Sequence, residues 1–138
     1  MKRLLFVVGL GFAGLHAGGF NAPMQAYMQE LTLEAKSVDG AFSGFDAKRG
    51  ESLFTTKHIG KKGTEVSCTT CHTANLKNNG QNSNTNKSIL PLAPSANAQR
   101  LTDVKEVQKW LRRNFNDVFA REGTAQEKGD VLSYIITQ

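Results

Sequence analysis

The chain has 138 residues, enough for one small domain, and 39% of them are hydrophobic, which is too many for a disordered protein. Its formal net charge is +5, but the lysines and arginines are spread along the chain and form no basic stripe of the kind that binds nucleic acid. Composition therefore excludes a disordered chain and indicates no nucleic-acid partner.

The first segment in chain order has the pattern of an export signal. Lys2 and Arg3 precede LLFVVGLGFAGL, an apolar stretch followed by small residues, as in a secretory signal peptide. A membrane-spanning helix needs about 20 apolar residues, so this stretch is short for a span. An uncleaved anchor is the alternative. We predict a signal over residues 1–19, cleaved after Ala17 or Gly19, and a bacterial periplasmic protein whose net charge without Lys2 and Arg3 is +3.

The rest of the chain has helical patterns joined by polar loops, so the predicted fold class is all-α. Asp46 and Thr102 are expected N-caps, and Thr124 with Glu127 matches a capping box. Two glycines within residues 38–45 predict a linker. We therefore divide the mature chain into an N-terminal helix with its linker, 20–45, and a main domain, 46–138. The predicted helices span residues 22–37, 46–58, 102–115 and 124–138.

The stretch SCTTCHT contains the only two cysteines of the chain, Cys68 and Cys71, followed directly by His72. An exported pair could form a disulfide or a thioredoxin-like redox site, although the sequence shows no βαβ pattern for the latter. A zinc site would need further ligands, such as His58. C-x-x-C-H is the attachment signature of c-type haem, with two thioethers and an axial histidine. We predict one haem c bound by Cys68 and Cys71, with His72 on the iron.

Short helices around a covalent haem are typical of a class I cytochrome c. In that family, a glycine on the helix before the haem lets the C-terminal helix cross closely, and aromatic residues cover the contact. Gly50, Phe54 and Tyr134 resemble that set. We therefore expect the class I cytochrome c fold over residues 46–138.

The usual distal ligand of such a cytochrome, a methionine after the haem motif, is missing, because all three methionines precede Cys68. On the predicted helix 102–115, the apolar positions Val107 and Leu111 are followed by Asn114 at helical spacing. Asn114 could cap the end of this helix or present its amide to the iron, as a weak, hard ligand that ferric iron tolerates better than ferrous iron. His58 is the competing distal candidate.

Other residues are expected around the haem. Trp110, the only tryptophan, lies one helical turn before Asn114 and could direct its N–H to a propionate or simply pack in the core. Arg100 and Arg113 could pair with propionates or remain in solvent. Pro91, or alternatively Pro94, could place its carbonyl to accept the ring N–H of His72. The apolar side chains of residues 89–100 are expected along the haem edge.

The stretches SCTTCH, LAPSA, VQKWLRRN and EKGDVLSYI resemble the sphaeroides haem protein (SHP) family, unusual class I cytochromes with histidine and asparagine on the iron. The resemblance covers some 90 residues and aligns the family's ligands with His72 and Asn114. It implies that the asparagine leaves on reduction, so that ferrous haem binds O2, NO or similar small ligands. It also implies electrons from a dihaem c-type cytochrome and a membrane cytochrome b.

One departure from that family lies beside Asn114. The family's founding member has a disulfide there, where this chain has Phe115 and Gly123. Two functions stay open: a redox-gated haem protein for small ligands, which could turn over O2 or NO, and a simple electron carrier whose iron is always six-coordinate.

Overall fold

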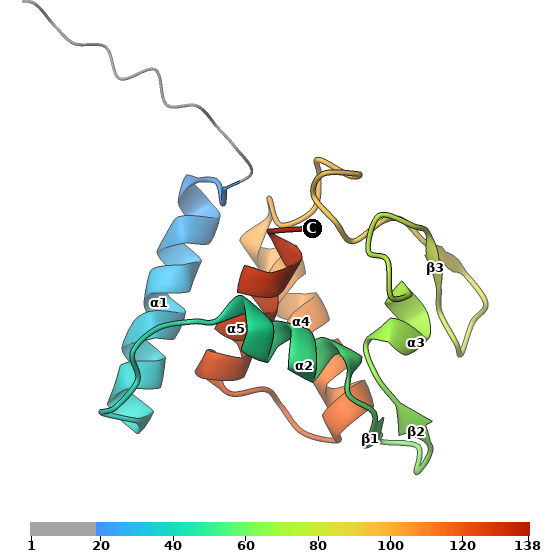
Figure 1. Ribbon diagram of the computed structural model, residues 1–138, viewed down its shortest axis with the longest axis horizontal. Coiled ribbons are helices and arrows are strands. Elements are labelled where there is room, and N and C mark those ends of the chain that lie inside the picture. Colours follow the sequence, from blue (N-terminus) through green and yellow to red (C-terminus); the bar gives the residue numbers. More distant parts are fainter. Residues whose placement is uncertain (1–18) are drawn as a thin grey trace, which may run out of the picture.

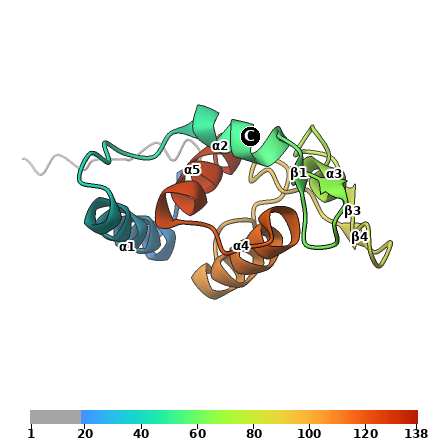
Figure 2. The same ribbon diagram turned by 90° about the horizontal axis from the view of Figure 1, so that it is seen from below.

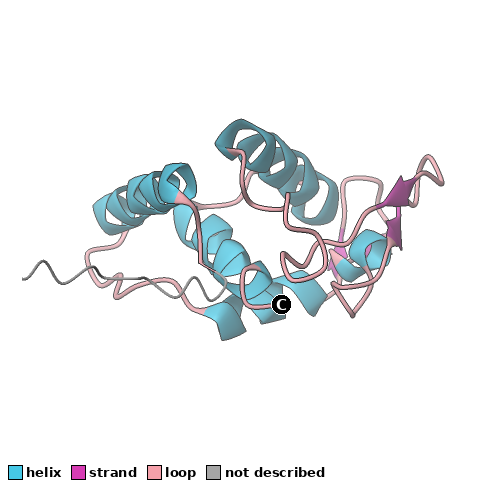
Figure 3. Cartoon of the chain, turned by 90° about the horizontal axis from the view of Figure 1, so that it is seen from above, coloured by secondary structure: helices cyan, strands magenta, loops and turns pink. Residues whose placement is uncertain are grey.

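The computed structural model describes residues 19–138, which form five helices and four two-residue strands. The predicted signal lies outside the described residues except for Gly19. The all-α class is confirmed, since the strands only form two small antiparallel hairpins, β1–β2 and β3–β4 (Figure 3). The elements are α1 (Ala22–Val38), α2 (Ala47–Thr55), β1 (His58–Ile59), β2 (Glu65–Val66), α3 (Thr69–His72), β3 (Gly80–Gln81), β4 (Ser88–Ile89), α4 (Val104–Phe119) and α5 (Ala125–Ile135).

The helices are placed one after another along the longest dimension of the molecule. α1 lies at one end, and α3 with both hairpins lies at the other (Figures 1 and 2). α5 lies between α1 and α2 and packs against both. α1 turns Met24, Tyr27, Leu31 and Ala35 inward at helical spacing, and these residues join the same core cluster as the residues of the other helices. None of the helices within residues 19–138 is long and apolar enough to cross a membrane.

Two of the predicted helix starts are confirmed and one is shifted. The Asp46 carboxylate accepts the N–H of Arg49 at the start of α2, and Thr124 with Glu127 forms the capping box of α5. At α4 the cap is Asp103 and not Thr102. Asp103 takes over because its carboxylate accepts the N–H of Glu106 at 3.0 Å, a role that short acidic side chains fill well.

The close crossing of α2 and α5 depends on Gly50. A Cβ at this position would overlap the backbone carbonyl of Asp130 and lie 3.0 Å from the Cβ of Tyr134. Next to this contact, the rings of Phe54 and Tyr134 lie 5.6 Å apart. The crossing predicted from these three residues is therefore present, and it places the C-terminus of α2 beside the haem-attachment helix α3, where Phe54 lies 6.1 Å from His72.

We expect Gly50→Ala to destabilise the fold by about 1–3 kcal/mol or more, the usual cost of forcing extra volume into a packed contact. The added methyl group meets backbone, which yields only if α5 shifts. The free energy of unfolding from denaturant titration measures this. Gly40→Ala is the control, because a Cβ there meets nothing within 4 Å. Equal stability of the two variants would contradict the close-crossing argument.

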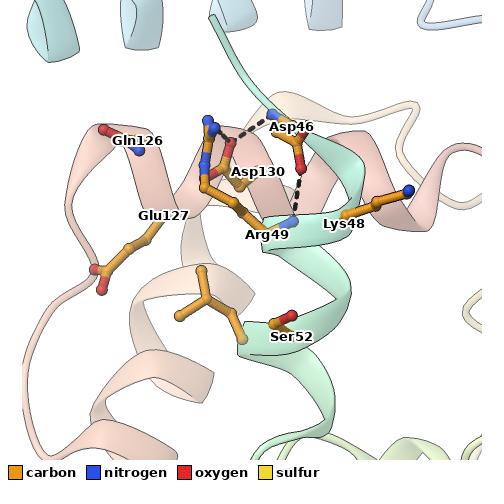
Figure 4. Close-up of a pocket in the computed structure, with 8 residues that line it drawn as sticks. Asp46, Lys48, Arg49, Ser52, Gln126, Glu127 and Asp130 are labelled. Carbon is orange, nitrogen blue, oxygen red and sulfur yellow. Dashed lines mark hydrogen bonds and ion pairs between the residues drawn. The ribbon is translucent and has the colours of Figure 1, made fainter. Parts of the chain in front are cut away.

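A buried ion pair joins the same two helices at the start of α2 (Figure 4). The Asp130 side chain is only 2% exposed and accepts hydrogen bonds from Arg49 Nε at 2.8 Å, Arg49 Nη2 at 2.9 Å and the backbone N–H of Asp46 at 2.7 Å. A buried carboxylate is costly unless it is paired, and these three donors satisfy it. The shallow groove of about 460 Å³ beside this pair is therefore a structural junction.

Candidate functional site

A cavity of about 1030 Å³ lies between α3, α4, α5 and the two hairpins. This is at the upper end of the range of roughly 300–1,000 Å³ that is usual for cofactor sites. Its walls are largely apolar, and the loop before α4 contributes Ile89, Leu90 and Leu92 as predicted. Six of the seven predicted haem-site residues line it, and only Pro91 does not: the six are Cys68, Cys71, His72, Arg100, Trp110 and Asn114.

The haem-attachment motif forms the short helix α3 at one wall of this cavity. The helical turn places the side chains of Cys68 and Cys71 on the same cavity, and neither forms a disulfide. Burial raises the pKa of the Cys68 thiol to about 12. A redox-active or zinc-binding cysteine needs the thiolate and is found where the pKa is lowered, whereas a thioether has no proton to lose. The environment of Cys68 therefore suits a thioether.

The zinc alternative finds no support in the described part of the chain, residues 19–138, where no three His, Cys, Asp or Glu side chains gather as metal ligands.

His72 has the properties of an axial haem ligand. Burial, assisted by the positive charge of Arg100, lowers the pKa of His72 to about 4, so the imidazole is neutral at physiological pH. Its Nδ1 is buried without a hydrogen-bond partner among the described residues. The ring lines the cavity, and a neutral histidine in that position could serve as an axial ligand of a haem.

The hydrogen bond predicted between the Pro91 carbonyl and the His72 ring is not made. The carbonyl of Pro91 instead accepts Arg100 Nε at 2.9 Å and Asn97 Nδ2 at 3.3 Å. These bonds brace the loop before α4, and Arg100 Nη2 adds a third at 2.7 Å to the carbonyl of Leu90. Arg100 thus supports the loop while it lines the cavity, and its pairing with a propionate stays a prediction.

Trp110 lines the cavity as expected but is not packed in the core, and its contact with a propionate stays a prediction. The side chain is 45% exposed, so it is not a core residue, and its Nε1–H donates to the Glu106 carboxylate at 3.1 Å across one helical turn. Arg113 lies over the indole ring and not in the cavity wall. The indole covers the edge of the cavity, and its N–H already has a partner on the same helix.

Asn114 lies inside α4, which continues beyond the predicted end at Phe115 to Phe119. The helix is capped by Ala120 in the left-handed conformation, φ 54°. The alternative that Asn114 caps the helix is therefore wrong, because its backbone has intrahelical partners on both sides. Its side chain lines the cavity, and no hydrogen bond to another described residue holds its amide.

The competing distal candidates lie away from this wall. Neither Met24 nor Met28 lines the cavity, and Met24 is fully buried in the core with α1. His58 does not line it either. Its ring packs on Phe119 with centroids 4.5 Å apart. Asn114 lines the cavity and these candidates do not; its role as the distal ligand stays a prediction.

The cavity with its two thiols, the neutral histidine and the surrounding helices defines the molecule as a class I c-type cytochrome. The protein family described as a domain of unknown function, DUF1924, matches residues 40–135. The cytochrome c-type protein SHP of Cereibacter sphaeroides is 47% identical over 93 residues, which cover 67% of this chain and 71% of that protein. The chain belongs to the SHP family and carries one covalently bound haem c.

Solved structures agree with this assignment. The structure of oxidised SHP, an oxygen-binding cytochrome c, is 42% identical with a TM-score of 0.72, covering 87% of this chain and 100% of that one. Oxidised cytochrome c'' from Methylophilus methylotrophus is 30% identical with a TM-score of 0.73, covering 83% of this chain and 94% of that one. The solution structure of the same cytochrome c'' was described as giving insights into the structural basis of haem-ligand detachment.

Sequence reasoning missed how Phe115 and Gly123 meet. A Cβ at Gly123 would lie 2.7–2.8 Å from three ring carbons of Phe115, so the ring lies flat on the glycine. The eight-residue spacing across a predicted helix end gave no sign of this contact. The signal that could have found it is the glycine itself, because a buried glycine near a large aromatic residue often marks a close approach.

Proposed function

We propose that this protein is an exported monohaem cytochrome whose distal ligand, Asn114, leaves when the iron is reduced and so opens the site to small ligands. When bound, the haem supplies an iron that changes between ferric and ferrous states and can take diatomic ligands such as O2 or NO. The chain supplies Asn114, the releasable ligand, which we call the gate. The observation that carries the proposal is the position of Asn114, on the cavity wall with an amide that no other described residue holds.

The ligand chemistry explains why an amide can act as a gate. An amide oxygen is a hard donor, which binds ferric iron better than the softer ferrous iron. A side chain without competing hydrogen bonds can leave the iron without breaking other contacts of the fold. The backbone of α4 stays hydrogen-bonded, because Asn114 lies well inside the helix. Release of this ligand therefore requires no unfolding.

Two relatives support the proposal. SHP is described as an oxygen-binding cytochrome c, and cytochrome c'' is associated with detachment of a haem ligand. Both share the fold of this chain over more than four-fifths of its length. Oxygen binding in one relative and haem-ligand detachment in the other support the two steps that we propose for this chain.

We propose further that electrons come from a dihaem c-type cytochrome, supplied in turn by a membrane cytochrome b, in the periplasm. The surface near the cavity is compatible with an acidic partner, because Lys61, Lys62 and Lys87 are exposed and line its edge. Exposed charges of one sign steer a partner of the opposite sign and raise the rate of encounter. The electron-transfer rate should therefore fall as ionic strength rises.

The alternative function is a simple electron carrier in which Asn114 stays on the iron in both oxidation states. The absorption spectrum of the ferrous protein with and without carbon monoxide distinguishes the two. We expect a high-spin ferrous spectrum that changes at once when the gas is added. A low-spin ferrous spectrum that does not respond to carbon monoxide would show that a strong ligand remains bound, and the gate would be excluded.

A further inference from the structure

The segment of α4 that carries Asn114 is held by a row of aromatic contacts, in which Phe115 and Phe119 also line the cavity. The ring of Phe115, 4% exposed, lies on Gly123 in the loop between α4 and α5. It also stacks with Phe119 at 5.1 Å and an interplanar angle of 24°. The ring of Phe119 packs in turn on His58, with centroids 4.5 Å apart. We call these four residues, His58, Phe115, Phe119 and Gly123, the aromatic clamp.

The β1–β2 hairpin holds the same end of α4 through its backbone. Lys61 donates its N–H to the carbonyl of Asp117 at 3.0 Å. This carbonyl lies in the last turn of α4, where such groups lack partners within the helix. Gly60 permits the approach, since a Cβ there would lie 2.6 Å from both the Asp117 carbonyl oxygen and Val66 Cγ2. The backbone one turn beyond Asn114 is therefore tied to the hairpin.

His58 is the member of the clamp that carries a buried polar atom. Its Nε2 is buried and has no hydrogen-bond partner among residues 19–138. A buried polar atom without a partner is a cost to the fold, so hydrogen bonding does not explain the placement of this ring. Its contact with the Phe119 ring is the interaction that the structure shows for it. The imidazole thus supports Phe119 through a tilted ring contact, with an interplanar angle of 46°.

From these contacts we infer that the aromatic clamp makes Phe115 and Phe119 positioning residues for Asn114. By fixing the backbone on which the amide is mounted, they set how firmly Asn114 holds ferric iron and how readily an external ligand replaces it. The inference rests on the proposed function, because it takes Asn114 as the distal ligand. A ligand amide must be placed within a fraction of an ångström, and only packing around its helix can do this.

The test loosens the clamp at the two members that do not line the cavity, Gly123 and His58. Gly123→Ala and His58→Ala act on Asn114 through Phe115 and Phe119, which do line it. Gly129→Ala is the matched control. There the added Cβ would overlap the ring of Phe45 and not the ring of Phe115. All three are made in the full haem-loaded protein, with thermal unfolding recorded for each.

Two measurements separate positioning from general loosening. Imidazole binding to the ferric protein requires displacement of Asn114, whereas association of carbon monoxide with the ferrous protein follows its release. We expect Gly123→Ala and His58→Ala to raise the ferric affinity for imidazole about tenfold, which corresponds to roughly 1.4 kcal/mol. Carbon monoxide association should keep its rate, and Gly129→Ala should leave both quantities unchanged.

The inference is overturned if the folded clamp variants bind imidazole as the parent does, or if the control gives the same rise. It is also overturned if carbon monoxide association speeds up in parallel, because the variants would then act on access to the cavity. If Gly123→Ala does not fold, His58→Ala decides. Failure of the proposed function looks different: Asn114→Ala would then leave the ferric affinity for imidazole unchanged.

Discussion

Replacement of Asn114 by alanine is expected to raise the affinity of the ferric protein for imidazole about 100-fold, equivalent to roughly 2.7 kcal/mol. In the parent protein an external ligand must displace the amide before it reaches the iron, and in the variant no side chain at this position competes. The ferric spectrum should change as well, because the sixth ligand is lost. Spectrophotometric titration of the ferric protein with imidazole measures both effects.

Asn116→Ala is the matched control for this experiment. Asn116 lies two positions further along α4, but its side chain does not line the cavity. The substitution is chemically the same and has a similar effect on helix propensity. Titration curves that coincide for the two variants would remove Asn114 from the distal side of the haem.

Loss of both attachment thiols, in Cys68→Ser/Cys71→Ser, is expected to leave a haem-free chain that does not hold this fold. Without the haem, the apolar walls of a cavity of about 1030 Å³ lose their packing partner and are exposed to water. Whole domains of this size are stable by only about 5–15 kcal/mol, so the loss of this burial is a large part of the total.

Far-ultraviolet circular dichroism of the haem-free variant should therefore show strongly reduced helix. Added haem should restore part of the signal, since His72 still offers its imidazole. The single variants Cys68→Ser and Cys71→Ser serve as controls, because one remaining thioether keeps the haem in the cavity. A haem-free double variant with the full helical signal and a cooperative unfolding transition would contradict the argument that the haem forms part of the core.

Local sequence signals predicted those parts of the fold that depend on neighbouring residues. Asp46 and the Thr124–Glu127 pair mark helix starts because capping is made within one turn. C-x-x-C-H predicted the haem because the thiols and the imidazole need only a single helical turn to reach the same cofactor. Gly50 with its aromatic partners was found because its spacing is characteristic of the fold family.

The errors fall where the outcome depended on contacts between distant segments. Helix α4 runs to Phe119 and not Phe115, because the β1–β2 hairpin satisfies its last turn through the bond from Lys61 to the carbonyl of Asp117. Pro91 does not serve His72, because Arg100 occupies its carbonyl. The indole N–H of Trp110 goes to Glu106 on its own helix. In each case the polar group forms its hydrogen bond with a donor or acceptor that the sequence pattern did not reveal.

By itself, the sequence determined the chemistry of the site: two thiols and a histidine for one haem, no methionine after them, and an asparagine on the apolar stripe of a later helix. Only the tertiary structure decided that Asn114 lines the cavity from inside α4, and that the neighbouring Phe115 rests on Gly123. The reason is physical. Covalent and ligand chemistry belongs to residue types and short spacings, whereas the position of a side chain depends on every segment packed against its helix.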